Sequence, residues 1–127
     1  MTKTNLTQLL ELVKKKGFLD NSVIRFIDKT FSSKWENIKG ALERGITKYI
    51  YKPSNKILWT AMGKGQEYIL YPKEFCSCMD FYKEVVINRN RNYCKHLLAQ
   101  VISIGLDSYQ TVELEDYEFR IRLEEMF

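Results

Sequence analysis

Apolar residues recur at helical spacing through the first 44 residues of the chain. The pattern predicts a helix over residues 4–16, a second helix after the cap signal at Asp20, and a third over residues 34–44. The positions expected to face inward are, in order, Leu6, Leu9, Leu10 and Val13; Val23, Phe26, Ile27 and Thr30 or Phe31; Trp35, Ile38 and Leu42. Each helix therefore has one apolar stripe to bury.

The pattern changes period at residue 46. Residues 46–52, 56–62 and 67–71 are rich in Ile, Tyr, Trp and Thr, as strands are. Pro53-Ser54-Asn55 separates the first two runs, and Gly63-Lys64-Gly65 separates the last two. Short strands joined by such turn signals predict a small antiparallel β-meander.

Two helices are expected after the last cysteine. One apolar stripe predicts a helix that ends near Gly105, made by Leu97, Leu98, Val101, Ile102 and Leu106. A last helix is predicted from about Glu113, where Leu114, Tyr117, Ile121 and Met126 follow loosely helical spacing. The fold class is therefore α+β, with N-terminal helices, the meander and C-terminal helices.

Length and composition indicate one globular domain over residues 1–127, whose parts are the helical residues 1–45, a central part over 46–106 and a last segment over 107–127. With 45% hydrophobic and 28% charged residues, the composition argues against disorder. Apolar runs are too short to cross a bilayer, and the first residues do not resemble a secretory signal. We expect a protein that is not secreted and makes no membrane contact, located in the cytoplasm, or in the nucleus of a eukaryote.

Charge is unevenly distributed. The formal net charge is +4, yet residues 107–127 hold seven acidic side chains against two arginines and carry −5, which leaves +9 on residues 1–106. A basic body favours contact with a polyanion, although many lysine-rich proteins are simply soluble.

The three cysteines and the single histidine gather in a short stretch, Cys76-Ser77-Cys78, fifteen residues, then Cys94-Lys95-His96. An odd number of cysteines fits a disulfide framework poorly. Two closely spaced pairs fit a tetrahedral Zn²⁺ instead, because each pair supplies half of the ligand shell at little cost in loop entropy. The plainer alternative is three buried thiols and a core histidine.

Four protein ligands would leave zinc no open position for water, and they would include the only histidine available as a base at neutral pH. The sequence also lacks the phosphate-loop, G-x-S-x-G and H-E-x-x-H motifs. We therefore expect one structural Zn²⁺ and no enzymatic activity, with Cys76, Cys78, Cys94 and His96 as its ligands.

The spacing C-x-C-x₁₅-C-x-H resembles the SWIM zinc finger. Residues 76–81 are similar to the CxCxxF opening of that family, and residues 94–99 are similar to its CKHLLA close. Met79 stands where many members have proline. The resemblance implies a β-meander leading into the finger. The short chain is also similar to the SWIM subunits of Shu-type recombination accessory complexes, which implies a role in homologous recombination and DNA repair beside a RecA-family paralogue.

The segment before the second ligand pair has the composition of a nucleic-acid contact. Arginine can fork to phosphate, asparagine can bind base edges or sugar, and tyrosine can stack on a base. The candidates are Asn88, Arg89, Arg91, Tyr93 and Lys95. An exposed polar hairpin would carry the same residues for solubility alone, and Phe81 is expected to be core beneath the finger.

Two hypotheses follow. In the first, the protein binds DNA, single-stranded in particular, through residues 88–95, together with a protein partner. In the second, it is a protein–protein adaptor whose terminal helices bind the partner without nucleic-acid contact.

Overall fold

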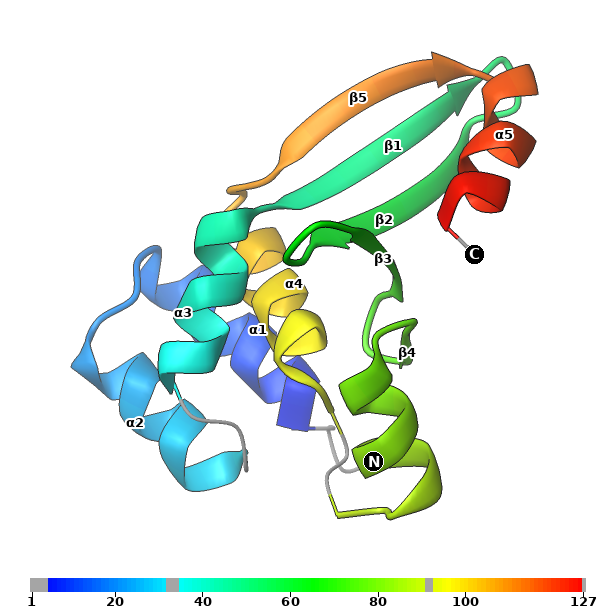
Figure 1. Cartoon of the computed structure of the whole chain (residues 1–127). Helices are drawn as coiled ribbons and strands as arrows, with labels where there is room; N and C mark the ends of the chain where they lie inside the picture. Colours follow the sequence, from blue (N-terminus) through cyan, green and yellow to red (C-terminus); the bar gives the residue numbers. More distant parts are fainter. Residues whose placement is uncertain (1–4, 32–34, 91–92, 127) are drawn as a thin grey trace.

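The computed structural model describes residues 5–31, 35–90 and 93–126 and has an α+β fold (Figure 1). Three helices come first, followed by three strands, the metal-ligand segment, a buried helix, a last strand and a last helix. In chain order these elements are α1 (Asn5–Lys16), α2 (Asn21–Thr30), α3 (Trp35–Arg44), β1 (Ile46–Lys52), β2 (Lys56–Met62), β3 (Glu67–Tyr71), β4 (Phe75–Cys76), η1 (Phe81–Ile87), α4 (Lys95–Gly105), β5 (Gln110–Glu115) and α5 (Tyr117–Met126). The predicted fold class is confirmed.

The sheet has five strands in the order β4-β3-β2-β1-β5. The three predicted strands form the expected antiparallel meander, with Trp59 paired to both Lys48 and Leu70. The fifth strand corrects the prediction of helix from residue 113, because residues 110–115 pair with β1 in parallel and the helix begins only at Tyr117. Val112 and Leu114 alternate with exposed glutamates and pack on a buried cluster, so the strand is half-buried.

Helix α4 packs against α1 and α3 and also contacts strands β1, β3 and β4 of the sheet (Figure 1). Its Leu98, Val101 and Ile102 pack in one buried cluster with α1, α2 and α3, whereas Leu97 and Ala99 pack in a second cluster that contains the cysteines. Gly105 permits the close approach of α1, because a Cβ there would lie 2.8 Å from Cγ1 of Val13. Helix α4 thus connects the helical core to the metal-ligand segment.

Although α4 is apolar on most sides, it has only 11 residues. About 20 apolar residues are needed to cross a bilayer. Across the part of the chain that the structure describes, no helix combines that length with that apolar character.

Helix α5 covers the other side of the sheet. Its Phe119 and Leu123 pack against buried side chains of the meander, namely Tyr49, Tyr51, Leu58 and Ile69. Arg122 lies over the Tyr49 ring, 4.2 Å from its centroid, and pairs with Glu67 at 2.7 Å. The acidic C-terminal segment is therefore part of the folded body.

The first half of the segment between the ligand pairs is helical, and the sequence pattern gives no secondary-structure prediction for it. Residues Phe81–Ile87 form the π-helix η1, and the Asn88 N–H donates to the Lys83 carbonyl five residues earlier (2.8 Å). Phe81 is buried, as predicted. Because Phe81 anchors the first turn beneath the finger, its packing overrides the strand propensity of the Val85-Val86-Ile87 run.

Candidate metal centre

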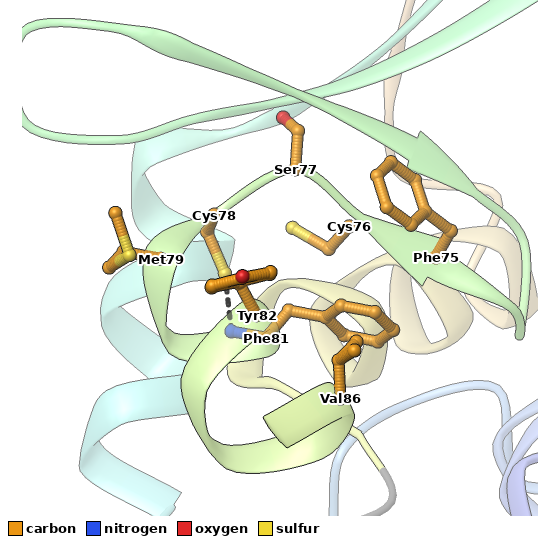
Figure 2. A pocket seen from close by; sticks show the side chains of 8 residues that line it. All are labelled: Phe75, Cys76, Ser77, Cys78, Met79, Phe81, Tyr82 and Val86. Carbon is orange, nitrogen blue, oxygen red and sulfur yellow. Dashed lines mark hydrogen bonds between the residues drawn. The ribbon is translucent and has the colours of Figure 1, made fainter. Parts of the chain in front are cut away.

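The first two cysteines flank a serine that faces the other way. Cys76 ends β4, and Cys78 lies two residues further on. Between them, the Ser77 N–H donates to the Ile69 carbonyl (3.0 Å), and the Ile69 N–H donates to the Ser77 hydroxyl oxygen (2.9 Å). Side chains alternate along extended backbone, so holding Ser77 on β3 turns both cysteines to the opposite side. Figure 2 shows Ser77 pointing away from the two sulfurs.

The second pair leaves from the start of α4. Cys94 is the N-cap residue, with an extended backbone (φ −92°, ψ 169°), and His96 lies in the first turn. The three cysteine sulfurs and one ring nitrogen of His96 all lie within 4.8 Å of one another, and all four residues are buried. The structure therefore brings together the four ligands predicted from the sequence.

The ring of His96 is oriented by its neighbours. Its Nδ1 lies 3.7 Å from Sγ of Cys76. A zinc tetrahedron with Zn–S of about 2.3 Å and Zn–N of about 2.05 Å has an S···N edge of about 3.6 Å. Nδ1 is therefore the nitrogen placed to bind a metal, and Nε2 lies on the other side of the ring.

Proton affinities differ sharply within the cluster. Hydrogen bonds from the thiols of Cys76 and Cys94 lower the pKa of Cys78, and the Phe81 N–H assists with a bond of 3.3 Å to its sulfur. The hydrogen bond to Cys78 raises the pKa of Cys76, and burial raises it further. One thiolate is thus favoured at the expense of its neighbours. Ionisation of all three buried thiols at such short range would require a cation among them.

The donor set fits zinc. Three sulfurs and one imidazole nitrogen in a buried cluster are the ligands of closed, tetrahedral Zn²⁺ sites. All three cysteines are free thiols, so each sulfur is available as a ligand. When bound, zinc would supply folding free energy by holding β4 and the N-terminus of α4 together.

The candidate nucleic-acid residues follow η1. Asn88 and Arg89 are exposed at its C-terminal end, and Arg89 has a left-handed backbone (φ 54°). Lys95 is the first residue of α4 and is half-buried beside His96. Tyr93 is half-buried too, and its ring packs edge-on against Phe31 with centroids 5.9 Å apart. Stacking of a base on Tyr93 would thus compete with this contact.

Arg91 lies outside the described residues. Two other basic residues, which sequence reasoning missed, line one cavity with Lys95: Arg44 at the end of α3 and Lys64 in the turn between β2 and β3. Their spacing along the chain gives no signal, because only the tertiary fold brings them to Lys95.

An apolar hollow of about 260 Å³ lies on the outer side of the first ligand pair (Figure 2). Phe75 and Phe81 pack edge-to-face in it, with ring centroids 5.6 Å apart. Met79, Tyr82 and Val86 line it as well, and each is at least half exposed. Apolar side chains are thus presented to solvent directly beside the metal ligands.

Comparison with known proteins supports the same interpretation. Over 104 residues the chain is 29% identical to a curated protein of Dictyostelium discoideum named zinc finger SWIM domain-containing protein 7 homolog. The match covers 80% of this chain and 65% of the relative. No protein-family model matches the chain, and no solved structure does. The resemblance to the SWIM zinc finger is confirmed, and the relative and the buried Cys₃His cluster together support a zinc-binding SWIM protein.

Proposed function

We propose that this zinc-binding protein is a non-enzymatic accessory factor of homologous recombination, whose finger binds single-stranded DNA and whose apolar surface binds a RecA-family paralogue. One observation carries the DNA part. Asn88 and Arg89 are exposed on the segment that joins the two ligand pairs, and the half-exposed Lys95 lies between the ligands Cys94 and His96 in the sequence. A bound zinc would hold the backbone that presents them. Such a factor acts in the cytoplasm, or in the nucleus of a eukaryote.

A structural role for one zinc ion follows from the ligand count. Cys76, Cys78, Cys94 and His96 supply four donors, which fill a tetrahedral shell and leave no position for a reactive water. Since His96 is the only histidine of the chain, its use as a ligand also removes the usual base at neutral pH.

The DNA hypothesis is tested with the zinc-loaded chain and a fluorescent oligodeoxythymidine. Changing Arg89 and Arg91 to alanine should weaken binding and flatten the dependence of log K on log salt by about one to two units, because each arginine releases a counterion from phosphate. Arg25 and Lys29, both exposed on α2, are the matched control when changed to alanine. Unmodified protein without salt-dependent binding would refute the DNA part.

The protein-partner part is supported by the apolar hollow at the finger. Exposed apolar side chains gathered on one surface mark interaction sites more often than isolated ones do. Here four exposed apolar side chains line the hollow beside the first ligand pair: Phe75, Met79, Tyr82 and Val86. The same observation supports the alternative of an adaptor without nucleic-acid contact.

Co-expression with RecA-family paralogues from the same genome tests this part. Val86→Glu should abolish co-purification, because it places a charge in the hollow. Ile121→Glu is the matched control, since Val86 and Ile121 are both 50% exposed but Ile121 lies on α5. A complex that survives Val86→Glu, or the lack of any complex with unmodified protein, would argue against the partner. Retained partner binding without DNA binding would favour the adaptor.

A further inference from the structure

A second cavity, of about 230 Å³, is lined by His96 but by none of the three cysteines. Four parts of the fold line it: the end of α3, the β2–β3 turn, β3 and the start of α4. Its lining residues are Arg44, Gly63, Lys64, Tyr68, Lys95 and His96. Three of the six are cations and none is an acid, so the cavity favours an anion.

Two buried hydrogen-bond donors of this lining have no partner among the described residues: Nε2 of His96 and Nε of Arg44. His96 is only 3% exposed, so bulk water does not satisfy its ring nitrogen. With Nδ1 facing the sulfurs, Nε2 keeps its proton when a metal is bound. Metal-bound histidines usually donate that proton to a carboxylate or a carbonyl. This one has no such acceptor in the described part of the chain, and it borders a basic cavity.

The shape of the cavity depends on a glycine. A Cβ on Gly63 would lie 2.4 Å from the Tyr68 ring, so only glycine lets that ring lie so close to the turn. The Tyr68 ring in turn packs on the His96 ring, with centroids 5.0 Å apart. The turn thus places Lys64 beside the aromatic wall formed by Tyr68 and His96.

We propose that this cavity binds a phosphate group. The group is a backbone phosphate of single-stranded DNA, an assignment that rests on the proposed function. Cavities for whole small molecules measure about 300–1,000 Å³, so about 230 Å³ suits a single group. Donors that converge from four parts of the fold suit a tetrahedral oxyanion, and arginine binds phosphate through its forked guanidinium. The phosphate accepts the His96 Nε2 proton and so links the cavity to the metal ligand.

The direct test is an NMR titration of the full, zinc-loaded chain with inorganic phosphate at constant ionic strength. His96 is the only histidine, so its Nε2–H signal is unambiguous. Phosphate should shift this signal saturably and slow its exchange with water. A signal that does not respond to phosphate would overturn the proposal, and a response that chloride reproduces would reveal an unspecific ionic effect and overturn it equally.

Two lysine variants test whether phosphate binds in this cavity. Lys64→Gln, at an exposed turn position, should weaken phosphate binding by about fivefold to tenfold, because a charge-assisted hydrogen bond is lost. Lys39→Gln removes the same charge from an exposed position of α3 outside the cavity and should change the affinity less than about twofold. Equal losses in the two variants would contradict the assignment.

Two further experiments test whether the bound phosphate belongs to DNA. Oligodeoxythymidine should displace inorganic phosphate, and Lys64→Gln should lower the salt slope of DNA binding by about one unit. If Lys64→Gln leaves DNA binding unchanged while the Arg89 and Arg91 variant weakens it, the cavity proposal fails and the proposed function stands. If phosphate binds but DNA does not, the site stands and the proposed function fails. If an acidic peptide shifts the His96 Nε2–H signal and phosphate does not, the cavity is not a phosphate site.

Discussion

Ser77 shows how one residue between two ligands sets their direction. Both of its hydrogen bonds go to Ile69 of β3, and they fix the extended backbone from which Cys76 and Cys78 point the same way. The ligand geometry thus depends on a residue that does not itself lie in the cluster.

Ser77→Ala should therefore weaken zinc binding by about tenfold and destabilise the zinc-loaded protein by about 1 kcal/mol, because the Ile69 N–H loses its acceptor. Competition with a chromophoric chelator measures the affinity, and urea unfolding measures the stability. Ser77→Thr keeps the hydroxyl and should stay close to the unmodified protein. Equal zinc affinity in the alanine and threonine variants would show that the Ser77 hydroxyl does not position the ligands.

Asp20 contributes a stabilisation that depends on pH. Its carboxylate accepts hydrogen bonds from the Ser22 hydroxyl (2.6 Å) and the Val23 N–H (3.0 Å), which lower its pKa below the usual 3.8. Because the folded-state pKa is the lower one, the stabilisation is complete above the unfolded-state pKa and disappears as the pH falls through the folded-state pKa.

Asp20→Ala should thus lower the melting temperature at pH 7, since α2 loses its N-cap. The difference from the unmodified protein should shrink as the pH falls below 3.8. Thermal unfolding followed by circular dichroism over this pH range measures it. A difference that stays constant down to acid pH would mean that the charged form of Asp20 adds nothing beyond the neutral form.

At the residue scale, the sequence predicts the metal cluster well and its surroundings poorly. Cys76, Cys78, Cys94 and His96 are found from spacing, because each pair lies on one short stretch of backbone. Arg44 and Lys64 become neighbours of His96 only through the tertiary fold. Local pattern therefore identifies ligands that are close in sequence and misses side chains brought together by packing.

Among the elements, α5 is held to the sheet by a half-buried polar network. Arg122 pairs with Glu67 and donates to the Tyr49 hydroxyl (2.8 Å), and Thr60 donates to the other carboxylate oxygen of Glu67 (2.9 Å). The side chains of Arg122 and Glu67 are only 24% and 20% exposed. Loss of either charge therefore leaves the other poorly solvated.

Glu67→Gln should lower the free energy of unfolding by about 2 kcal/mol, because the Arg122 guanidinium loses its carboxylate. Urea unfolding of the zinc-loaded protein measures this change. Glu124→Gln is the matched control on α5, because the Arg120–Glu124 pair is largely exposed and should contribute less than about 1 kcal/mol. Equal losses of unfolding free energy in the two variants would show that the half-buried network stabilises the fold no more than the exposed ion pair does.

The meander and β5 differ in how far the sequence predicts them. Strands β1, β2 and β3 have the residue ranges predicted from composition and turn signals, since antiparallel neighbours are joined by short local turns. Strand β5 pairs in parallel with β1, about 60 residues earlier in the chain. Its alternating Val112 and Leu114 gave a weak signal that the loosely helical spacing after residue 113 obscured.

Over the whole molecule, the acidic C-terminal segment begins at one edge of the sheet. The acidic strand β5 forms one edge, and β4, which carries Cys76, forms the other. The net charge of −5 on residues 107–127 therefore begins at the sheet edge remote from the finger, while residues 1–106 carry +9. The excess of basic residues over residues 1–106 favours contact with a polyanion.

We propose that one zinc ion, bound by Cys76, Cys78, Cys94 and His96, joins β4 to α4 and completes the fold. Elemental analysis of the purified chain, with circular dichroism before and after chelation, tests it most directly. We expect one zinc per chain, its loss in Cys94→Ser, and cooperative loss of structure when the metal is removed. A metal-free chain that is fully folded would contradict it.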